Sequence, residues 1–250
     1  MKISIITVTY NSAATIRDTL ESVKKQDYPN IEHIIIDGAS TDATLQIVKE
    51  YPSVSSIVSE PDNGIYDAMN KGIKIATGNI IGILNSDDIF AADSIISDVA
   101  KIFERTEIDA VYGNLSYFRT GEEGKIVRLW QTKPYYERFF EDGELPPHPT
   151  LYVRKKVYDG MGAFRTDYKI AADIEFMLRL LKVKKAQSFF LDKIMVKMRL
   201  GGASTSGFKS YWTVTLETKR LWAENGLTYP FKLYFIRPLK KIQQLIRLDD

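Results

Sequence analysis

The first third of the chain alternates continuously apolar segments with segments in which apolar residues recur every three or four positions. The continuous segments are rich in β-branched residues and cover residues 3–9, 31–36, 56–59 and 79–84. Such runs are typical of strands that are covered on both faces. The periodic segments predict intervening helices, each with one apolar face, formed by Ile16, Leu20 and Val23, by Leu45, Val48 and Tyr51, and by Ile65, Met69 and Ile73.

Polar residues indicate where these helices begin and end. Asn11-Ser12 and Ser40-Thr41-Asp42 are candidate N-caps, and Gly78 is a candidate C-cap. Four strands joined by helical crossovers favour a mostly parallel sheet with helices on both faces and right-handed connections. We therefore expect an α/β fold for this part of the chain.

The rhythm changes after about residue 110. Residues 110–115 and 125–130 predict two strands around the turn Gly121-Glu122-Glu123-Gly124, and residues 133–150 are loop-like and contain three prolines near their end. The remaining predicted elements are a helix at 173–181, a strand at 194–198, a glycine- and serine-rich loop at 201–207, and helices at 208–225 and 229–248.

Composition narrows the class of protein. The chain has 250 residues, of which 44% are hydrophobic and 26% charged, so it can bury a sizeable core and is not largely disordered. A net charge of +2 gives no electrostatic case for nucleic-acid binding. The absence of cysteine excludes disulfides, thiolate zinc sites and a cysteine nucleophile.

The distribution of apolar residues predicts the location of the protein. The apolar N-terminal segment is too short for a secretory signal, and no run approaches the roughly 20 apolar residues of a membrane span. Residues 229–248 mix apolar residues with five cations and no acid: Lys232, Arg237, Lys240, Lys241 and Arg247. We expect a cytoplasmic protein whose C-terminal helix, kinked at Pro238, contacts the inner face of the membrane, packs on the domain, or contacts a second subunit of a homodimer.

Polar clusters come directly after three of the predicted strands: Thr9-Tyr10-Asn11, Asp37-Gly38-Ala39-Ser40 and Asn85-Ser86-Asp87-Asp88. In parallel sheets, ligands bind at the carboxyl ends of the strands. Paired carboxylates such as Asp87 and Asp88 can bind Mg²⁺ or Mn²⁺ while a substrate diphosphate supplies other ligands. The same acids are also typical of a simple turn with a helix cap before Ala91.

Other polar residues allow both a functional and a structural interpretation. Tyr10 can stack on a base, and Asp37 can accept hydrogen bonds from a base or ribose, although capping alone would explain such residues. Asp173 begins a predicted helix, where the dipole would stabilise it as a cap. His148 can touch substrate, assist a metal or only pack, whereas we interpret His33, inside a predicted strand, as structural.

The chain lacks the phosphate-binding loops of two nucleotide-binding classes. Residues 9–14, after the first predicted strand, lack the glycine-rich turn of dinucleotide-binding enzymes, and the chain has no Walker-type phosphate loop. A sugar-phosphate nucleotidyltransferase is a further α/β alternative. Those enzymes need a glycine-rich basic loop near the N-terminus, and residues 9–17 contain no glycine and only one basic residue, Arg17.

Taken in order, these motifs resemble family 2 of the glycosyltransferases, which has the GT-A fold, and in particular bacterial capsule, colanic-acid and O-antigen transferases. The matching stretches are residues 5–11, 36–42, 59–72, 84–88, 172–173 and 201–205. The resemblance implies a three-layer GT-A sandwich with a mostly parallel central sheet over residues 1–207. It divides this catalytic domain into a nucleotide-binding half, 1–110, and an acceptor-binding half, 111–207, with a helical extension, 208–250, at its C-terminal end.

The resemblance also implies roles for individual residues. Asp173 matches the catalytic base, which would deprotonate the acceptor hydroxyl as its oxygen attacks the anomeric carbon with inversion. Asp88 is the first candidate for the metal, and Asp87 for ribose or metal. His148 is expected to contact the acceptor or the residues that bind the acceptor. The donor is expected to contact Thr9, Tyr10, Asn11, Asp37, Asp62, Asn70, Lys71, Ser86 and Asp87.

We therefore expect a Mn²⁺- or Mg²⁺-dependent transferase in bacterial cell-surface polysaccharide synthesis. Its donor would be a UDP- or GDP-sugar, and its acceptor a saccharide or lipid-linked saccharide. Asn85 stands where many family members have aspartate, and no C-terminal histidine is available as a metal ligand, so the metal would be bound more weakly or shared differently. The alternative from another class is a non-catalytic nucleotide-sugar-binding or scaffolding subunit at the membrane, which would need no base at Asp173.

Overall fold

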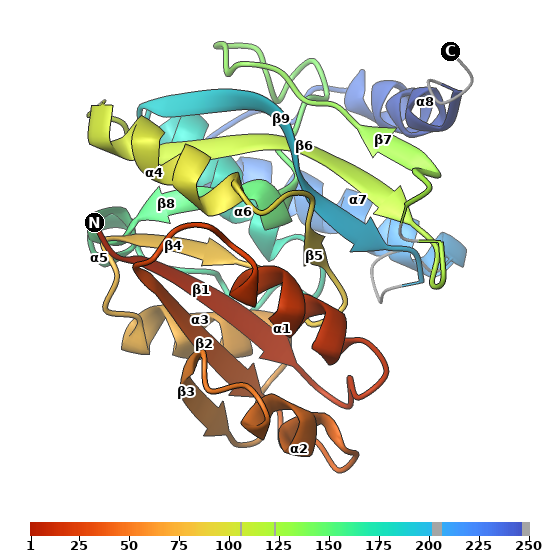
Figure 1. The fold of residues 1–250 in the computed structure, drawn as a ribbon. Coiled ribbons are helices and arrows are strands. Elements are labelled where there is room, and N and C mark those ends of the chain that lie inside the picture. The colour runs from red at the N-terminus through yellow and green to blue at the C-terminus, as the bar shows by residue number, and fades with distance from the viewer. Residues whose placement is uncertain (106, 123, 202–206, 247–250) are drawn as a thin grey trace.

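One mixed sheet runs through the protein, as seen in the computed structural model (Figure 1), which describes residues 1–105, 107–122, 124–201 and 207–246. Its first part is parallel, in the spatial order β3-β2-β1-β4. The strands are β1 (Ile3–Thr9), β2 (Ile31–Asp37), β3 (Val54–Ser59) and β4 (Ile80–Ile83). The four predicted strands are thus confirmed, with β3 beginning two residues earlier than expected.

The second part of the sheet continues from β4 without a break, in the order β8-β6-β9-β5, with β7 paired to β6. Here most neighbours are antiparallel, and only β6 and β9 run parallel. The strands are β5 (Ile89–Phe90), β6 (Ala110–Phe118), β7 (Arg128–Trp130), β8 (Tyr152–Arg154) and β9 (Ser188–Arg199). The two proposed halves of the catalytic domain therefore share one sheet.

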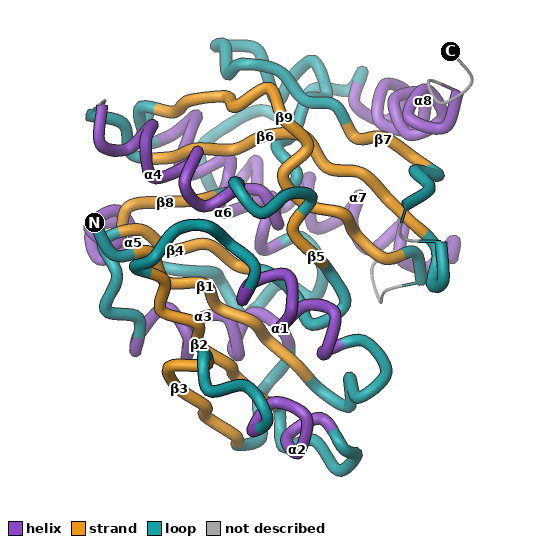
Figure 2. Tube along the Cα trace, in the orientation of Figure 1, coloured by secondary structure: helices purple, strands orange, loops and turns teal. Residues whose placement is uncertain are grey.

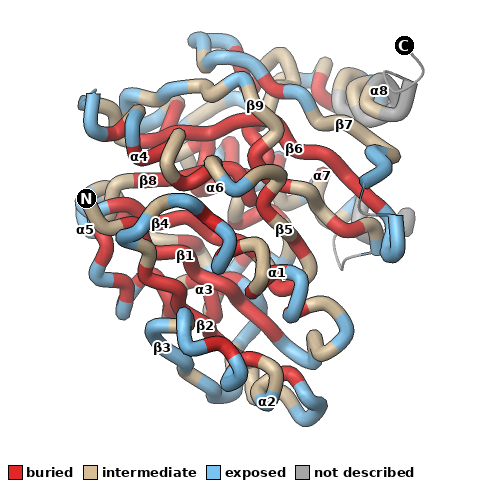
Figure 3. The backbone as a smooth tube through the Cα atoms, in the orientation of Figure 1, coloured by how far each residue is buried: buried red, intermediate tan, exposed pale blue. Residues whose placement is uncertain are grey.

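Helices cover both faces of this sheet, which gives three layers (Figure 2). The side chains of β1 alternate between them: Ile6 and Val8 face a core with α3 and α6, whereas Ile3 and Ile5 face a core with α4. In the middle layer, strands β1, β2, β4 and β6 are almost wholly buried, whereas the edge strand β3 is mostly exposed (Figure 3). The helices are α1 (Ile16–Lys24), α2 (Thr44–Lys49), α3 (Ile65–Ile75), α4 (Ile95–Arg105), α5 (Lys155–Met161), α6 (Ala172–Leu178) with a π-helical turn (Arg179–Val183), α7 (Gly207–Glu224) and α8 (Leu233–Ile246), besides a 3-10 turn (His148–Thr150).

Two of the predicted helix boundaries are wrong. Helix α1 begins at Ile16 rather than directly after Ser12, because the Ser12 carbonyl first accepts the N–H groups of Thr15 and Ile16 in a turn. Gly78 does not cap α3, which ends at Ile75. Glycine is needed at this position because the chain passes close to the backbone of β1: a Cβ at Gly78 would lie 2.7 Å from the Ser4 backbone nitrogen.

Two further local expectations are corrected in part. Ala43 occupies the N-cap position of α2, but the Asp42 carboxylate does accept the Thr44 N–H at 2.9 Å. Ile65 is not on the buried face of α3. It is the first helical residue and is 47% exposed, whereas Met69 and Ile73, one and two turns later, are buried.

The C-terminal helix α8 packs on the domain through one face. Leu233 is buried there, and Lys232 and Lys240 form ion pairs with Asp142 and Glu144, both at 2.6 Å. Pro238 lies inside α8. The expected loop residues 202–206 and Arg247 lie outside the described residues. Within the described ranges, no helix is both long and apolar enough to cross a membrane.

Candidate active site

The loops after β1, β2 and β4 meet at the carboxyl edge of the parallel strands. The Asn11 N–H donates to Ser40 Oγ at 2.8 Å, and Asn11 Oδ1 accepts the Thr41 N–H at 2.9 Å, which joins the first two loops. Ser12 Oγ lies 2.8 Å from Ser86 Oγ, which joins the first and third. The structure therefore brings together all three polar clusters that the sequence places at strand ends.

Backbone strain is present in two of these loops. Asn11 has φ 50° and Ala39 has φ 62°, both in the left-handed region that residues with a Cβ rarely occupy. Asparagine tolerates this conformation, but for alanine it costs about 1–2 kcal/mol. Strain of this kind gathers at functional sites.

Asp37 ends β2 and is fully buried. Its carboxylate accepts the Ser40 N–H at 3.0 Å and the hydroxyl groups of Ser40 and Ser59. Three donors thus fix this side chain at the strand end, beside the loop where a base or ribose is expected to bind.

Gly38 allows Tyr10 and Asp62, which are both expected to contact the sugar donor, to come close to the backbone after β2. A Cβ at Gly38 would lie 2.6 Å from Asp62 Oδ2 and 3.4 Å from Tyr10 Cδ2. The Tyr10 side chain is 63% exposed, so its ring is open to stacking. Tyr10, Asp37 and Asp62 therefore lie around one short stretch of backbone.

The carboxylate pair comes after β4. Asp88 is fully buried and Asp87 partly buried, and Thr19 Oγ1 holds this loop by donating to the Asp88 carbonyl at 2.8 Å. Asn85 Nδ2 donates to Asp88 Oδ2 at 3.2 Å. Three buried oxygens at the ends of β1 and β4 have no hydrogen-bond partner among the described residues: Thr9 Oγ1, Asn85 Oδ1 and Asp88 Oδ1.

Electrostatics at this pair favours a bound cation. Burial, and then the neighbouring charge of Asp87, raise the pKa of Asp88 well above its usual range, while hydrogen bonds from Asn85 and the Arg199 backbone act in the opposite direction. Burial also raises the pKa of Asp87. A buried carboxylate with an unpartnered oxygen is stabilised by a proton or by a cation.

Carboxylate and amide oxygens of this kind fit a hard divalent cation. The candidate ligands are the carboxylates of Asp88 and Asp87 and the side-chain oxygen Oδ1 of Asn85. Within the part of the chain that the structure describes, no group of three or more histidine, cysteine, aspartate or glutamate side chains could hold a metal ion. A metal at Asp88 would therefore need further ligands from a diphosphate and from water.

Arg199, which the sequence analysis did not single out, also influences this pair. Its positive charge lowers the pKa values of Asp87 and Asp88. It ends β9, pairs with Asp18 at 2.7 Å, and stacks over the ring of Phe118. Arg199 is thus a buried cation that acts on the two carboxylates.

Asp173 lies in the first turn of α6, as expected, and is partly buried. Its Oδ1 accepts the Ile174 N–H at 2.8 Å and the Tyr66 hydroxyl at 3.3 Å. Tyr66 comes from α3, and its single O–H is shared between Asp173 Oδ1 and the closer Ile170 carbonyl. Burial and the Asp173 charge raise the pKa of Tyr66 strongly, so the phenol stays protonated and acts as a donor.

His148 lies in an aromatic cluster next to Tyr66. Its ring meets Phe164 edge-on at 5.3 Å, and Phe164 in turn packs on Tyr66 at 5.9 Å. Burial lowers the pKa of His148 to about 4, so the ring is neutral near pH 7. A role near the acceptor stays a prediction. The second histidine, His33, is buried, and its Nε2 lies 3.0 Å from Thr7 Oγ1, in agreement with a structural role.

Two expected donor-site residues are engaged within the protein. Asn70 bridges to the backbone of Phe164 through both its amide nitrogen and its carbonyl oxygen. Lys71 Nζ pairs with Glu60 at 2.9 Å and donates to the Pro61 carbonyl at 2.8 Å. Contact of Lys71 with a phosphate stays a prediction, and it would require rearrangement of this ion pair.

Comparison with known proteins identifies relatives of this chain. The sequence profile of a family described as Glycosyl transferase family 2 matches residues 4–157. The chain is 31% identical over 185 residues to a PGL/p-HBAD biosynthesis glycosyltransferase of Mycobacterium bovis, covering 70% of this chain and 68% of that protein. It is 33% identical over 108 residues to the putative teichuronic acid biosynthesis glycosyltransferase TuaG of Bacillus subtilis, covering 42% and 43%.

Solved structures share the fold. S. aureus TarS 1-349 in complex with UDP is 25% identical and superposes with a TM-score of 0.71, covering 94% of this chain and 68% of that one. The mannosyltransferase PcManGT from Pyrobaculum calidifontis, in complex with GDP-Man and Mn²⁺, is 18% identical and superposes with a TM-score of 0.67, covering 97% and 72%. At that identity the second likeness shows the fold alone. The expected GT-A fold is confirmed.

The raised pKa of Asp88 predicts a trade-off between stability and metal binding. Because the folded state raises this pKa, ionisation of Asp88 costs stability as pH rises above the ordinary aspartate value. We expect Asp88→Asn, without metal and near neutral pH, to be more stable than wild type by about 1–3 kcal/mol. We also expect it to lose any rise in unfolding temperature on adding Mn²⁺.

Denaturant and thermal unfolding with Mn²⁺ or with EDTA measure both effects. The matched control is Asp27→Asn, an exposed aspartate, which should behave as wild type. An Asp88→Asn variant that is less stable than wild type without metal and still responds to Mn²⁺ contradicts this account.

Proposed function

This chain belongs to glycosyl transferase family 2, and from that premise we propose that it is a metal-dependent, inverting enzyme. It moves a sugar from a UDP- or GDP-linked donor onto an acceptor hydroxyl. The observation that carries the proposal is the meeting of three strand-end loops at one edge, with Asp88, a buried carboxylate with an unpartnered oxygen, in the loop after β4. Such a carboxylate suits a cation bound together with a diphosphate.

The donor nucleotide would bind at the edge of β1 and β2. Tyr10 offers an exposed ring for stacking, and Asp62 and Asp37 flank the Gly38 backbone with carboxylates. Thr9, Asn11 and Ser86 complete this edge. The structures similar in fold include complexes with UDP, UDP-GlcNAc and GDP-Man, which supports a nucleotide-linked sugar without selecting the base.

Asp88 and Asp87 would hold Mn²⁺ or Mg²⁺. When bound, such an ion neutralises charge that develops on the leaving diphosphate. The chain's own contribution is to keep two carboxylates and Asn85 at one buried position, where Thr19 fixes the loop. Arg199 adds a permanent positive charge nearby.

Asp173 is the proposed base. Its carboxylate accepts the proton of the acceptor hydroxyl while that oxygen forms a bond to the anomeric carbon and the bond to the diphosphate breaks on the opposite side. Configuration at the anomeric carbon is thereby inverted. Hydrogen bonds from Tyr66 and the Ile174 N–H orient the carboxylate.

The relatives suggest the kind of acceptor. Two are named for the synthesis of PGL/p-HBAD and of teichuronic acid. We therefore place this enzyme in bacterial cell-surface polysaccharide synthesis, with a saccharide or a lipid-linked saccharide as acceptor.

Exposed apolar side chains of the C-terminal segment support a lipid-linked acceptor. Phe235 and Leu239, which are one turn apart on α8 and so share one face of that helix, are 62% and 58% exposed. Phe231, in the turn before α8, is 72% exposed, and its ring lies 5.7 Å from that of Phe235. The opposite face of α8 packs on the domain, so we propose that this outer face rests on an anionic membrane surface.

Replacement of the proposed base tests the reaction. In Asp173→Asn the amide cannot accept the proton, so we expect the transfer rate to fall by about 10²–10⁴-fold, with donor binding close to wild type. Transfer is measured with a nucleotide-sugar panel and Mn²⁺, and donor binding by calorimetry. Equal transfer by both proteins would rule Asp173 out as the base. Donor binding without turnover by wild type, across a broad acceptor panel, would favour a non-catalytic subunit.

Liposome co-sedimentation tests the membrane surface. The double variant Phe231→Ser, Phe235→Ser should lose at least about tenfold in partitioning to phosphatidylglycerol vesicles, since each phenylalanine contributes about 1.5–3 kcal/mol when fully buried. Ile57→Ser, which changes an exposed apolar residue of the edge strand β3, is the control. Unchanged partitioning would refute this surface, and loss of a dimer instead would assign it to a second copy of the chain.

A further inference from the structure

We propose that Glu217, on α7, is a positioning residue for the base Asp173, and that α7 therefore forms part of the catalytic unit. The inference rests on the proposed function, in which Asp173 takes the acceptor proton. Glu217 lies more than forty residues along the chain from Asp173, and its carboxylate binds the backbone segment that leads into α6.

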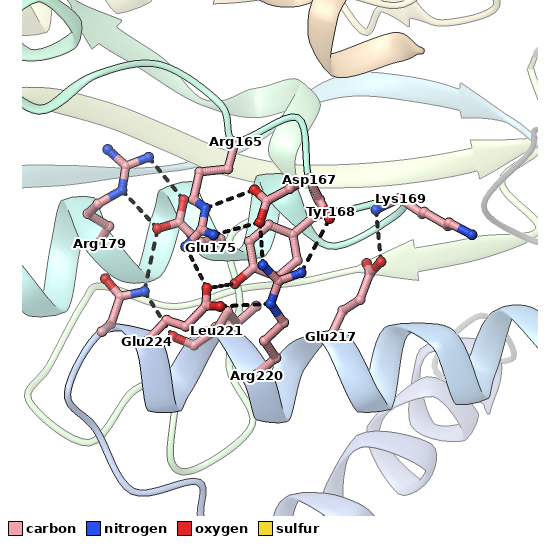
Figure 4. A network of polar contacts seen from close by, with 11 residues as sticks. Arg165, Asp167, Tyr168, Lys169, Glu175, Arg179, Glu217, Arg220, Leu221 and Glu224 are labelled. Carbon is pink, nitrogen blue, oxygen red and sulfur yellow. Dashed lines mark hydrogen bonds and ion pairs between the residues drawn. The ribbon is translucent and has the colours of Figure 1, made fainter. Parts of the chain in front are cut away.

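The contact is made by three consecutive backbone amides. Glu217 Oε1 accepts the Lys169 N–H at 2.8 Å (Figure 4). Its Oε2 accepts the Ile170 and Ala171 N–H groups, both at 3.0 Å. Successive N–H groups that point to one side form a concave anion site, and bonds to an ionised acceptor are stronger than neutral ones. One carboxylate thus fixes the whole segment 169–171.

The same segment is held from its other side by α3. The Tyr66 hydroxyl donates to the Ile170 carbonyl and lies 3.3 Å from Asp173 Oδ1. Glu217 therefore binds the N–H groups of this segment, and Tyr66 binds a carbonyl of it. Because Asp173 lies only two residues after Ala171, a displacement of the segment would move the base.

The charge of Glu217 also acts on Tyr66. Burial and the charge of Asp173 raise the pKa of Tyr66, and the charge of Glu217 adds least to this shift. The phenol is therefore protonated near pH 7 with or without Glu217, and Glu217 supports the base by geometry.

A second set of contacts on α7 provides a matched control. One and two turns after Glu217, Arg220 and Glu224 pair with Asp167 and Arg165, and Tyr168 donates to Glu224 at 2.6 Å (Figure 4). These contacts dock α7 on residues 165–168 but do not touch the amides of 169–171. Glu224 is the same residue type on the same helix, and its ion pairs are partly exposed.

The experiment compares Glu217→Gln with Glu224→Gln, both of which keep the side-chain shape and remove one charge. We expect Glu217→Gln to lower kcat by about 10–100-fold, because a displacement on the order of 1 Å has effects of this size. The donor KM and Kd should stay at wild-type values, since the donor edge is formed by other loops. Glu224→Gln should stay within about threefold of wild type, as expected for exposed ion pairs.

Hydrogen exchange of the 169–171 amides gives a readout that does not depend on catalysis. Glu217→Gln should speed this exchange and Glu224→Gln should not. In an Asp173→Asn background, Glu217→Gln should cause no further loss of transfer, because residues that act as a unit are not additive. Unchanged exchange, faster exchange with unchanged kcat, or a full additional loss in that background would each overturn the proposal.

Failure of the underlying function would look different. If Asp173→Asn kept full activity, the base assignment would fall and the role given to Glu217 would fall with it, while faster exchange in Glu217→Gln would still be observed.

Discussion

The pairing of β1 with β2 on one side and β4 on the other is the constraint on which the site depends. All seven residues of β1 are buried, so each of its backbone polar groups must find a partner in the neighbouring strands. The register places Thr9 opposite Asp37 and Ile6 opposite Ile83. Polar residues directly after these strands consequently emerge at one edge, whatever the loops themselves prefer.

A comparison of Asp88 with Glu32, a second buried carboxylate, shows that burial alone does not leave a carboxylate oxygen without a partner. Glu32 is also buried, which alone would raise its pKa, but hydrogen bonds from Ser4, Thr77 and Lys2 lower that pKa to about 2. Asp88 receives fewer donors and has Asp87 as a neighbour, so its pKa rises. The protein satisfies a structural carboxylate and leaves one incompletely satisfied in the loop after β4. That contrast is typical of a site that is completed by a ligand.

The strand-end clusters could be predicted because strands buried on both faces have a continuous apolar pattern and end abruptly in polar residues. Asp173 was singled out by family resemblance, since an acid in the first turn of a helix is common. Tyr66 and Glu217 could not be found from local pattern, because their contacts join residues 104–107 and 46–48 positions apart. Likewise, Gly78 suggests a helix end in the sequence, and only the packing against Ser4 shows why glycine is needed.

Calorimetric titration of the wild-type protein with UDP and with GDP, each with Mn²⁺ and with EDTA, tests the proposed donor and metal site. We expect one nucleoside diphosphate to bind and the metal to strengthen its binding, because Asp88 and the diphosphate would share the cation. Binding that is equally strong without metal, or no binding of either nucleotide under any condition, would contradict a donor and metal site at the carboxyl edge of β1, β2 and β4.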